Sequence, residues 1–168
     1  MENLKKALKN RLQSARRIAV LGIGSELRGD DAAGILVVKR IEKYRGRLGR
    51  QRGIKGFYGG TAPENITGQI KKFKPTHLII VDSADTAGKA GKISLIEPEQ
   101  EAVVFFSTHR LPVKILIKYL LTSIDCKIIL IGIKPKAIDF CCSVSKEVEK
   151  SAEYLADSIR GIFSVESL

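Results

Sequence analysis

Cysteine is scarce in this chain of 168 residues, which contains Cys126, Cys141 and Cys142 and no others. They form no CxxC pair and an odd number cannot pair completely, so the sequence excludes a disulfide scaffold and a thiolate zinc module. No apolar run reaches the roughly 18–20 residues that a membrane span requires. The opening segment, MENLKKALKNRLQSARR, also lacks the continuous apolar stretch of a secretory signal. We therefore expect a soluble, cytoplasmic protein with no membrane span.

Aromatic residues are also few, at 6% with no tryptophan, while the net charge is +11. The lysines and arginines gather in residues 5–17 and 39–55. A basic surface that binds single-stranded nucleic acid needs aromatic side chains on which bases can stack, and only Tyr44 lies among these basic residues. We therefore interpret them as a solvated helix face and a basic loop, and expect no nucleic-acid partner.

Short apolar runs alternate with segments of helical periodicity, which is typical of an α/β domain with a buried parallel sheet. The apolar runs predict strands at residues 17–22, 57–60, 77–81, 92–96 and 127–133. The periodic segments predict helices at residues 1–15, 31–45, 63–73, 112–124 and after Ser145. The predicted fold is an α/β three-layer sandwich: a twisted, mostly parallel sheet of about five strands with helices on both faces. We expect residues 1–168 to form one domain, with residues 1–16 as an N-terminal helix extension.

A glycine-rich turn, GIGSELRGDD over residues 22–31, follows the first predicted strand. The dinucleotide fingerprint GxGxxG requires a small residue at position 27, where this chain has Leu27. The Walker A pattern fits Gly24 and Gly29 but then requires lysine, and the chain has Asp30. Because the two aspartates would repel a phosphate, the turn predicts no nucleotide site. Taken alone, an aspartate that caps the following helix is the simplest interpretation.

Side chains that can bind a metal ion follow several of the predicted strands. Asp31 ends the glycine-rich turn, Asp82 ends the run HLIIV, and His109 lies in the segment STHRLP before a helix. Because the carboxyl ends of parallel strands meet at one edge of a sheet, these three side chains can converge there. Two carboxylates and one imidazole suit a divalent first-row metal ion and leave positions for another ligand. A cation would also relieve the repulsion between the carboxylates.

Each of these residues also has an ordinary structural interpretation. Asp82 and Asp85 fit turns, and His109 fits a hydrogen bond at the start of a helix. A serine hydrolase that uses Ser107 or Thr108 beside His109 would lack the nucleophile elbow GxSxG, so we do not favour it.

Other residues with reactive side chains are expected to pack inside the protein. His77 begins a predicted strand, and Cys141 and Cys142 follow Phe140. We expect His77 to be a structural residue, and Cys141 and Cys142 to be buried packing residues.

Five motifs occur in the order found in hydrogenase maturation endopeptidases: GIGSELRGDDAAG, YGGTAPE, HLIIVDSAD, STHRLP and LIGIKPK. The sequence resembles this family from about Ile18 to the last helix. It resembles most the branch that processes the catalytic subunit of formate-hydrogenlyase-type and other membrane-bound nickel–iron hydrogenases. Such enzymes are peptidases that remove a short C-terminal extension from the large-subunit precursor after nickel has been inserted. The resemblance thus implies a hydrolase whose partner is that precursor, and we expect it to be a monomer.

By this resemblance, the nickel ligands and catalytic residues fall on Asp31, Asp82 and His109, and the nickel arrives with the substrate. The family's usual GxGN and DDGxG patterns are changed here by Ser25 and Ala32, neither of which removes a proposed ligand. Asp30 points about 100° away from its neighbour around a helix axis, so we expect it to support the loop.

Two other functions would use the same three residues. One is a metal-dependent hydrolase that cleaves an amide or peptide bond of another substrate. The other is a nickel-binding maturation chaperone without catalytic activity.

Overall fold

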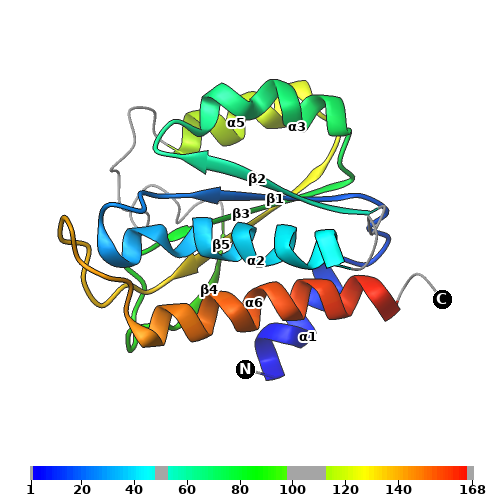
Figure 1. The fold of residues 1–168 in the computed structure, drawn as a ribbon. Coiled ribbons are helices and arrows are strands. Elements are labelled where there is room, and N and C mark those ends of the chain that lie inside the picture. The colour runs from blue at the N-terminus through cyan, green and yellow to red at the C-terminus, as the bar shows by residue number, and fades with distance from the viewer. Residues whose placement is uncertain (1, 48–52, 98–112, 166–168) are drawn as a thin grey trace.

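A computed structural model of the protein, which describes residues 2–47, 53–97 and 113–165, contains a five-stranded sheet between two layers of helices (Figure 1). The strand order is β2-β1-β3-β5-β4, and the first four of these are parallel. β4 is antiparallel to β5 and forms one edge. The strands are β1 (Ile18–Ile23), β2 (Ile54–Gly60), β3 (His77–Ser83), β4 (Ile93–Ile96) and β5 (Lys127–Ile133).

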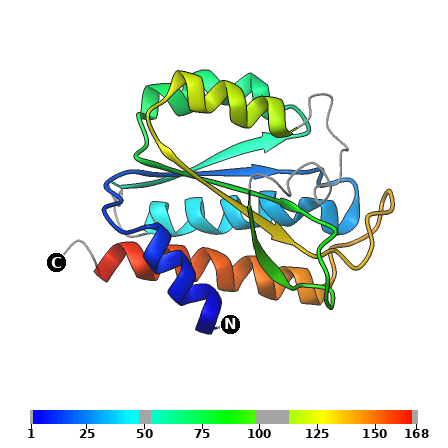
Figure 2. The ribbon, with the colours of Figure 1, turned by 180° about the vertical axis from the view of Figure 1, so that it is seen from behind.

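The helices cover both faces of the sheet, as the two opposite views show (Figure 1, Figure 2). One layer contains α1 (Glu2–Arg11), α2 (Ala33–Arg47) and α6 (Lys146–Val165). The other layer contains α3 (Thr67–Phe73) and α5 (Val113–Ser123). Two short 3-10 helices, η1 (Gly29–Ala32) and η2 (Pro63–Ile66), lead into α2 and α3.

The two hydrophobic clusters of the core lie on opposite faces of the sheet. Successive side chains of a strand point to opposite faces, so Ile18 and Val20 of β1 belong to the cluster beneath α2 and α6. Ala19 and Leu21 belong to the other cluster, which includes residues of α3 and α5. Every residue of β1 and β3 is buried, as expected for strands covered on both sides.

The predicted α/β three-layer fold is confirmed, and two boundaries differ from the prediction by three residues or more. The strand predicted at residues 57–60 begins at Ile54. The N-terminal helix ends at Arg11, and Ser14 then adopts a φ of 66°, a left-handed conformation that a right-handed helix cannot include. Among the residues that the structure describes, no helix is long and apolar enough to cross a membrane.

Candidate active site

The carboxyl ends of β1 and β3 form the point at which the strand order reverses. From β1 the chain crosses through α2 on one face to reach β2, and then through α3 on the other face to reach β3. The two connections therefore leave this edge on opposite faces of the sheet, where open α/β sheets bind their ligands. Asp31 follows β1 and Asp82 is the second-to-last residue of β3, so both predicted carboxylates lie at the carboxyl ends of these strands.

The turn after β1 brings Asp31 back toward the strand end. Gly24 has a φ of 130°, and a Cβ atom at this position would lie far inside van der Waals contact of the backbone oxygen of Asp31. Only glycine permits this approach. The backbone N–H of Ser25 then donates a 3.0 Å hydrogen bond to Oδ2 of Asp31. The turn thus fixes the carboxylate as well as the backbone of Asp31.

Ser83, the last residue of β3, connects the two carboxylates. Its hydroxyl donates a 3.0 Å hydrogen bond to Oδ1 of Asp31, and its backbone N–H donates a 2.7 Å bond to Oδ1 of Asp82. All three residues are fully buried. The structure therefore brings Asp31 and Asp82 together, as the sequence predicts. Ser83 was not predicted, although its position directly after Asp82 could have suggested a role.

The electrostatics of this pair are unusual for the interior of a protein. A buried carboxylate is costly unless a charge or several hydrogen bonds compensate it. Among the described residues, Asp31 accepts its bonds from the neutral groups of Ser25 and Ser83, and none of the ion pairs found there includes it. A second carboxylate, that of Asp82, lies nearby, because Ser83 donates hydrogen bonds to both side chains. Such a pair favours a cation nearby.

Asp30, next to the site, has a different role. Its Oδ2 accepts hydrogen bonds from the backbone N–H groups of Lys136 and Ala137, at 2.7 and 3.3 Å, and from the hydroxyl of Ser145, at 2.9 Å. Its Oδ1 accepts a 2.6 Å bond from the backbone N–H of Ser145, the residue before α6. This carboxylate therefore joins the β1 turn to the β5–α6 loop, as the prediction of a supporting role implied.

The two substitutions that depart from the usual motifs fit the turn. The hydroxyl of Ser25 accepts a 3.3 Å hydrogen bond from the backbone N–H of Leu27. Ala32 ends η1 and is not among the residues with positive φ, so no glycine is required there.

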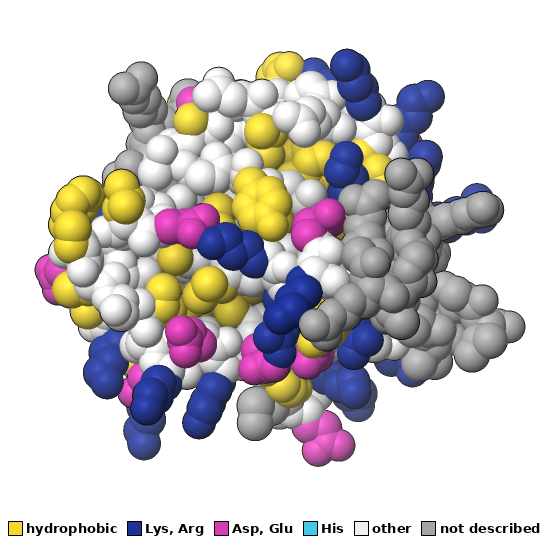
Figure 3. Space-filling view, in the orientation of Figure 1, with side chains coloured by type: hydrophobic (Ala, Val, Ile, Leu, Met, Phe, Trp, Pro, Cys, Tyr) yellow, Lys and Arg dark blue, Asp and Glu magenta, His cyan; other side chains and the backbone are white. Residues whose placement is uncertain are grey.

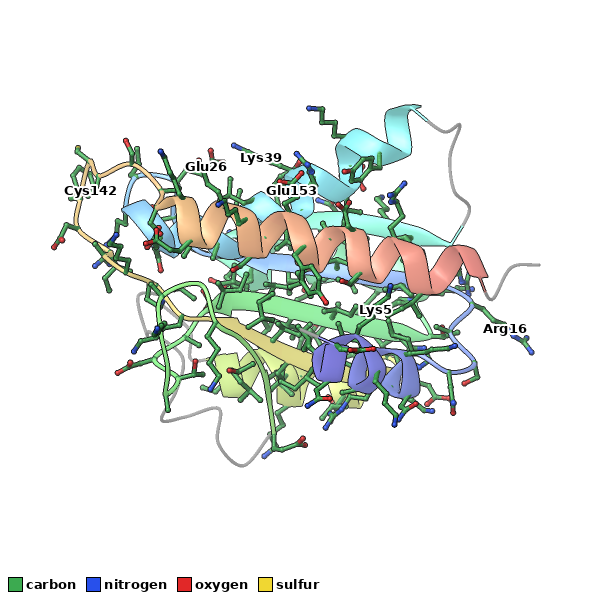
Figure 4. All side chains as sticks on the ribbon, turned by 90° about the horizontal axis from the view of Figure 1, so that it is seen from below. Lys5, Arg16, Glu26, Lys39, Cys142 and Glu153 are labelled. Carbon is green, nitrogen blue, oxygen red and sulfur yellow. The ribbon has the colours of Figure 1, made fainter. Side chains whose placement is uncertain are left out.

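Two sequence predictions about reactive residues have different outcomes. His77 is buried at the start of β3, at the opposite end of the strand from Asp82. Its Nδ1 lies 3.1 Å from the hydroxyl of Thr76, so its structural role is confirmed. Cys141 and Cys142 are exposed, so their predicted burial is wrong. The β5–α6 loop carries them beyond the sheet, with Cys142 at one end of the molecule (Figure 4).

His109, the third predicted ligand, lies outside the described residues, as do Ser107 and Thr108. Within the described ranges, no group of three or more His, Cys, Asp or Glu side chains is arranged to hold a metal ion. What the structure contributes is therefore the carboxylate pair, Asp31 and Asp82.

Comparison with known proteins decides the family. The sequence model of the hydrogenase maturation proteases matches residues 35–162. The chain belongs to this family. The protease is 39% identical over 159 residues to a putative hydrogenase maturation protease of Methanocaldococcus jannaschii, covering 93% of this chain and 94% of the relative. It is 30% identical over 147 residues to the hydrogenase 3 maturation protease of Escherichia coli strain K12, covering 84% and 88%.

Solved structures agree with this assignment of the protease. The crystal structure of the NiFe hydrogenase maturation protease HycI from Thermococcus kodakarensis superposes with a TM-score of 0.83 at 30% identity, covering 94% of this chain and 99% of that chain. The solution structure of the endopeptidase HycI from Escherichia coli gives a TM-score of 0.74 at 29% identity, covering 86% and 90%. The protease is therefore a hydrolase that cleaves peptide bonds in hydrogenase maturation.

Proposed function

We propose that this protease removes the C-terminal extension from the large-subunit precursor of a nickel–iron hydrogenase after nickel insertion. Its substrate is a hydrogenase of the formate-hydrogenlyase or other membrane-bound type. Asp31, Asp82 and His109 bind the nickel that the precursor already holds. The observation that carries this proposal is the position of Ser83. It donates hydrogen bonds to two buried carboxylates at the point where the strand order of the sheet reverses.

The donor set fits nickel that is already partly coordinated. Carboxylate oxygens bind divalent first-row metal ions, and imidazole nitrogen suits nickel particularly well. Asp31 and Asp82, both fully buried, supply two of these donors at the carboxyl ends of β1 and β3. Asp31 accepts hydrogen bonds from neutral donors alone among the described residues, which leaves its negative charge for a cation to compensate.

Binding to the substrate's metal also explains how the protease would distinguish a loaded precursor. Without nickel, the precursor offers the two carboxylates no cation, and their mutual repulsion remains. With nickel, the same carboxylates gain an attraction that holds the C-terminal segment at the site. A bound metal ion supplies Lewis-acid chemistry, by polarising a carbonyl or by lowering the pKa of a water molecule.

The experiment is a mass measurement of the hydrogenase large-subunit precursor, loaded with nickel or free of it, after incubation with the protease. Wild-type protease is expected to release a C-terminal fragment from the loaded precursor alone. Asp31→Asn, Asp82→Asn and His109→Ala are each expected to abolish the release. Asp85→Asn is the matched control, because Asp85 is an exposed aspartate near the same strand end that pairs with Lys134. It should cleave as the wild type does.

Other results would redirect the assignment. Nickel-dependent binding without cleavage would replace the peptidase with a nickel-binding chaperone. Cleavage of the nickel-free precursor at the same rate as the loaded one would show that the protease does not recognise its substrate through the metal. Full activity of Asp31→Asn would show that this carboxylate is not a ligand.

A further inference from the structure

Two loops at the active-site edge together expose an apolar surface. Leu27, in the turn after β1, is 62% exposed, and Phe140, in the β5–α6 loop, is 67% exposed. Cys141 and Cys142 beside Phe140 are exposed as well. We call these four residues the apolar tip. Figure 3 shows hydrophobic side chains on the projection that these loops form, in the orientation of Figure 1.

The apolar tip is held in place by hydrogen bonds between the two loops. The backbone N–H of Cys141 donates a 2.8 Å bond to the backbone oxygen of Leu27. Nε of Arg28 donates a 3.3 Å bond to the backbone oxygen of Ile138, and Asp30 binds both ends of the same loop through Lys136, Ala137 and Ser145. These bonds fix the relative position of the backbones that carry Leu27 and Phe140.

The apolar tip adjoins the proposed metal-binding residues. Leu27 lies four positions before Asp31 in the same turn, and the loop that carries Phe140 is bonded to Asp30. Figure 4 shows Glu26 and Cys142 at the same end of the molecule. Anything that places a metal ion against Asp31 therefore brings its own surface close to Leu27 and Phe140.

We propose that the apolar tip docks into an uncharged, apolar depression on the hydrogenase precursor, next to the segment that carries the metal. This inference rests on the proposed function. The tip itself has no charged side chain, and large apolar side chains gain binding free energy by leaving water. The neighbouring charges of the β1 turn are already engaged, since Glu26 pairs with Lys39 and Arg28 bonds to the β5–α6 loop. The exposed Asp139 directly precedes Phe140, but the four residues of the tip themselves favour an apolar surface.

The small area of the apolar tip favours the hydrogenase precursor as its partner over a second copy of the chain. A fully covered aromatic side chain buries roughly 150–250 Å², whereas each partner in a stable interface contributes about 800 Å². Leu27 and Phe140 alone supply far less than that. They can, however, add affinity and orientation to a complex that the metal-binding residues already hold.

The test compares Leu27→Ser, Phe140→Ser and the double variant with wild type on the nickel-loaded precursor. The double variant is expected to raise KM at least tenfold, which corresponds to about 1.4 kcal/mol, with a much smaller change in kcat. Phe140→Leu retains an apolar side chain and should restore most of the affinity. Leu121→Ser is the matched control, because Leu121 is a 55% exposed leucine near the end of α5, next to the opposite edge of the sheet.

Binding measurements on nickel-free precursor separate the tip from the metal site. Contact with the apolar tip needs no metal, so the weak binding of nickel-free precursor should fall in the tip variants and persist in Asp31→Asn. Unchanged KM and unchanged binding in the double variant would overturn the proposal for the tip alone. A wild-type dimer that the double variant converts to a monomer would also overturn it, since the tip would then cover a second copy.

The same binding data distinguish failure of the docking proposal from failure of the proposed function. Tip-dependent binding of the precursor without any cleavage would support the docking surface and reject the peptidase assignment on this substrate. Absence of both cleavage and binding with wild-type protease would overturn both proposals.

Discussion

The hydroxyl of Ser83 donates a 3.0 Å hydrogen bond to Oδ1 of Asp31, a residue 52 positions earlier in the chain. Its backbone N–H donates to Oδ1 of the adjacent Asp82. Ser83 therefore orients carboxylates that reach the site from two neighbouring strands. Its hydroxyl fixes the rotation of the Asp31 carboxylate and its backbone N–H that of Asp82, and neither group adds a charge.

Ser83→Ala is expected to weaken the binding of nickel-loaded precursor by about three- to tenfold. The substitution removes one hydrogen bond to Asp31, worth about 0.5–1.5 kcal/mol, and leaves the backbone bond to Asp82 in place. Ser83→Thr retains the hydroxyl and should recover part of the loss. The affinity of wild type and variants for loaded and nickel-free precursor is the measurement. A loss of equal size for both precursors would mean that Ser83 acts on the fold rather than on the metal-binding carboxylates.

Asp30→Asn is expected to lower the free energy of unfolding by about 2–4 kcal/mol. The carboxylate accepts bonds from three residues of the β5–α6 loop, Lys136, Ala137 and Ser145. An asparagine keeps a single acceptor oxygen, so some of these donors lose their partner inside the protein. Denaturant unfolding gives the energy, and amide hydrogen exchange should quicken at residues 136, 137 and 145.

Asp139→Asn is the control for that substitution, because Asp139 is an exposed aspartate in the same loop. It should change the stability by less than about 0.5 kcal/mol. Equal stability of Asp30→Asn and wild type would contradict the stabilising role of the bonds from Asp30 to the β5–α6 loop.

Much of the site could be predicted from the sequence because it depends on strand ends. The runs before Gly22 and Asp82 predict buried parallel strands, and the edge at which such strands end follows from topology. The partners of Asp30 could not be predicted, since Lys136 and Ser145 lie more than one hundred positions away and bind it through backbone groups as well as a hydroxyl. Because every residue except proline has a backbone N–H, the residue type does not indicate which of these groups bonds to Asp30.

Gly34→Ala is expected to destabilise the protein by about 3 kcal/mol or more. A Cβ atom at this position would lie far inside van der Waals contact of the backbone oxygen of Val81 and close to the backbone of Ile23. Backbone atoms at the core of the sheet cannot move aside cheaply, so α2 would be pushed away from β1 and β3. Thermal or denaturant unfolding measures the loss.

Gly161→Ala is the matched control, a glycine of α6 whose added Cβ would meet nothing within 4 Å. It should raise stability by roughly 0.5–1 kcal/mol, because alanine loses less backbone entropy in a helix. Comparable destabilisation by both substitutions would show that the close backbone approach at Gly34 is not the cause of the loss of stability in Gly34→Ala.

The cysteines show where apolar sequence is misleading. The run Phe140-Cys141-Cys142 is apolar and predicts packing, yet it lies on a loop that hydrogen bonds hold beyond the end of the sheet. Cys141 has a φ of 62°, outside the conformations of a strand or helix that could have carried the run into the core. Exposure here depends on loop anchoring by Leu27 and Asp30, which periodicity does not report.

Alkylation should therefore distinguish the three thiols of the native protein. Burial, with a further contribution from Asp125, raises the pKa of the Cys126 thiol, so less of the reactive thiolate is present at pH 8. Cys141 and Cys142 are exposed and should react with iodoacetamide at least about tenfold faster. The rate at Cys126 should keep rising as the pH passes the ordinary thiol pKa of about 8.5. Mass mapping of the labelled peptides gives the three rates. In denaturant they should become similar, whereas similar rates in the native protein would place Cys126 in solvent and contradict its half-buried position between α5 and β5.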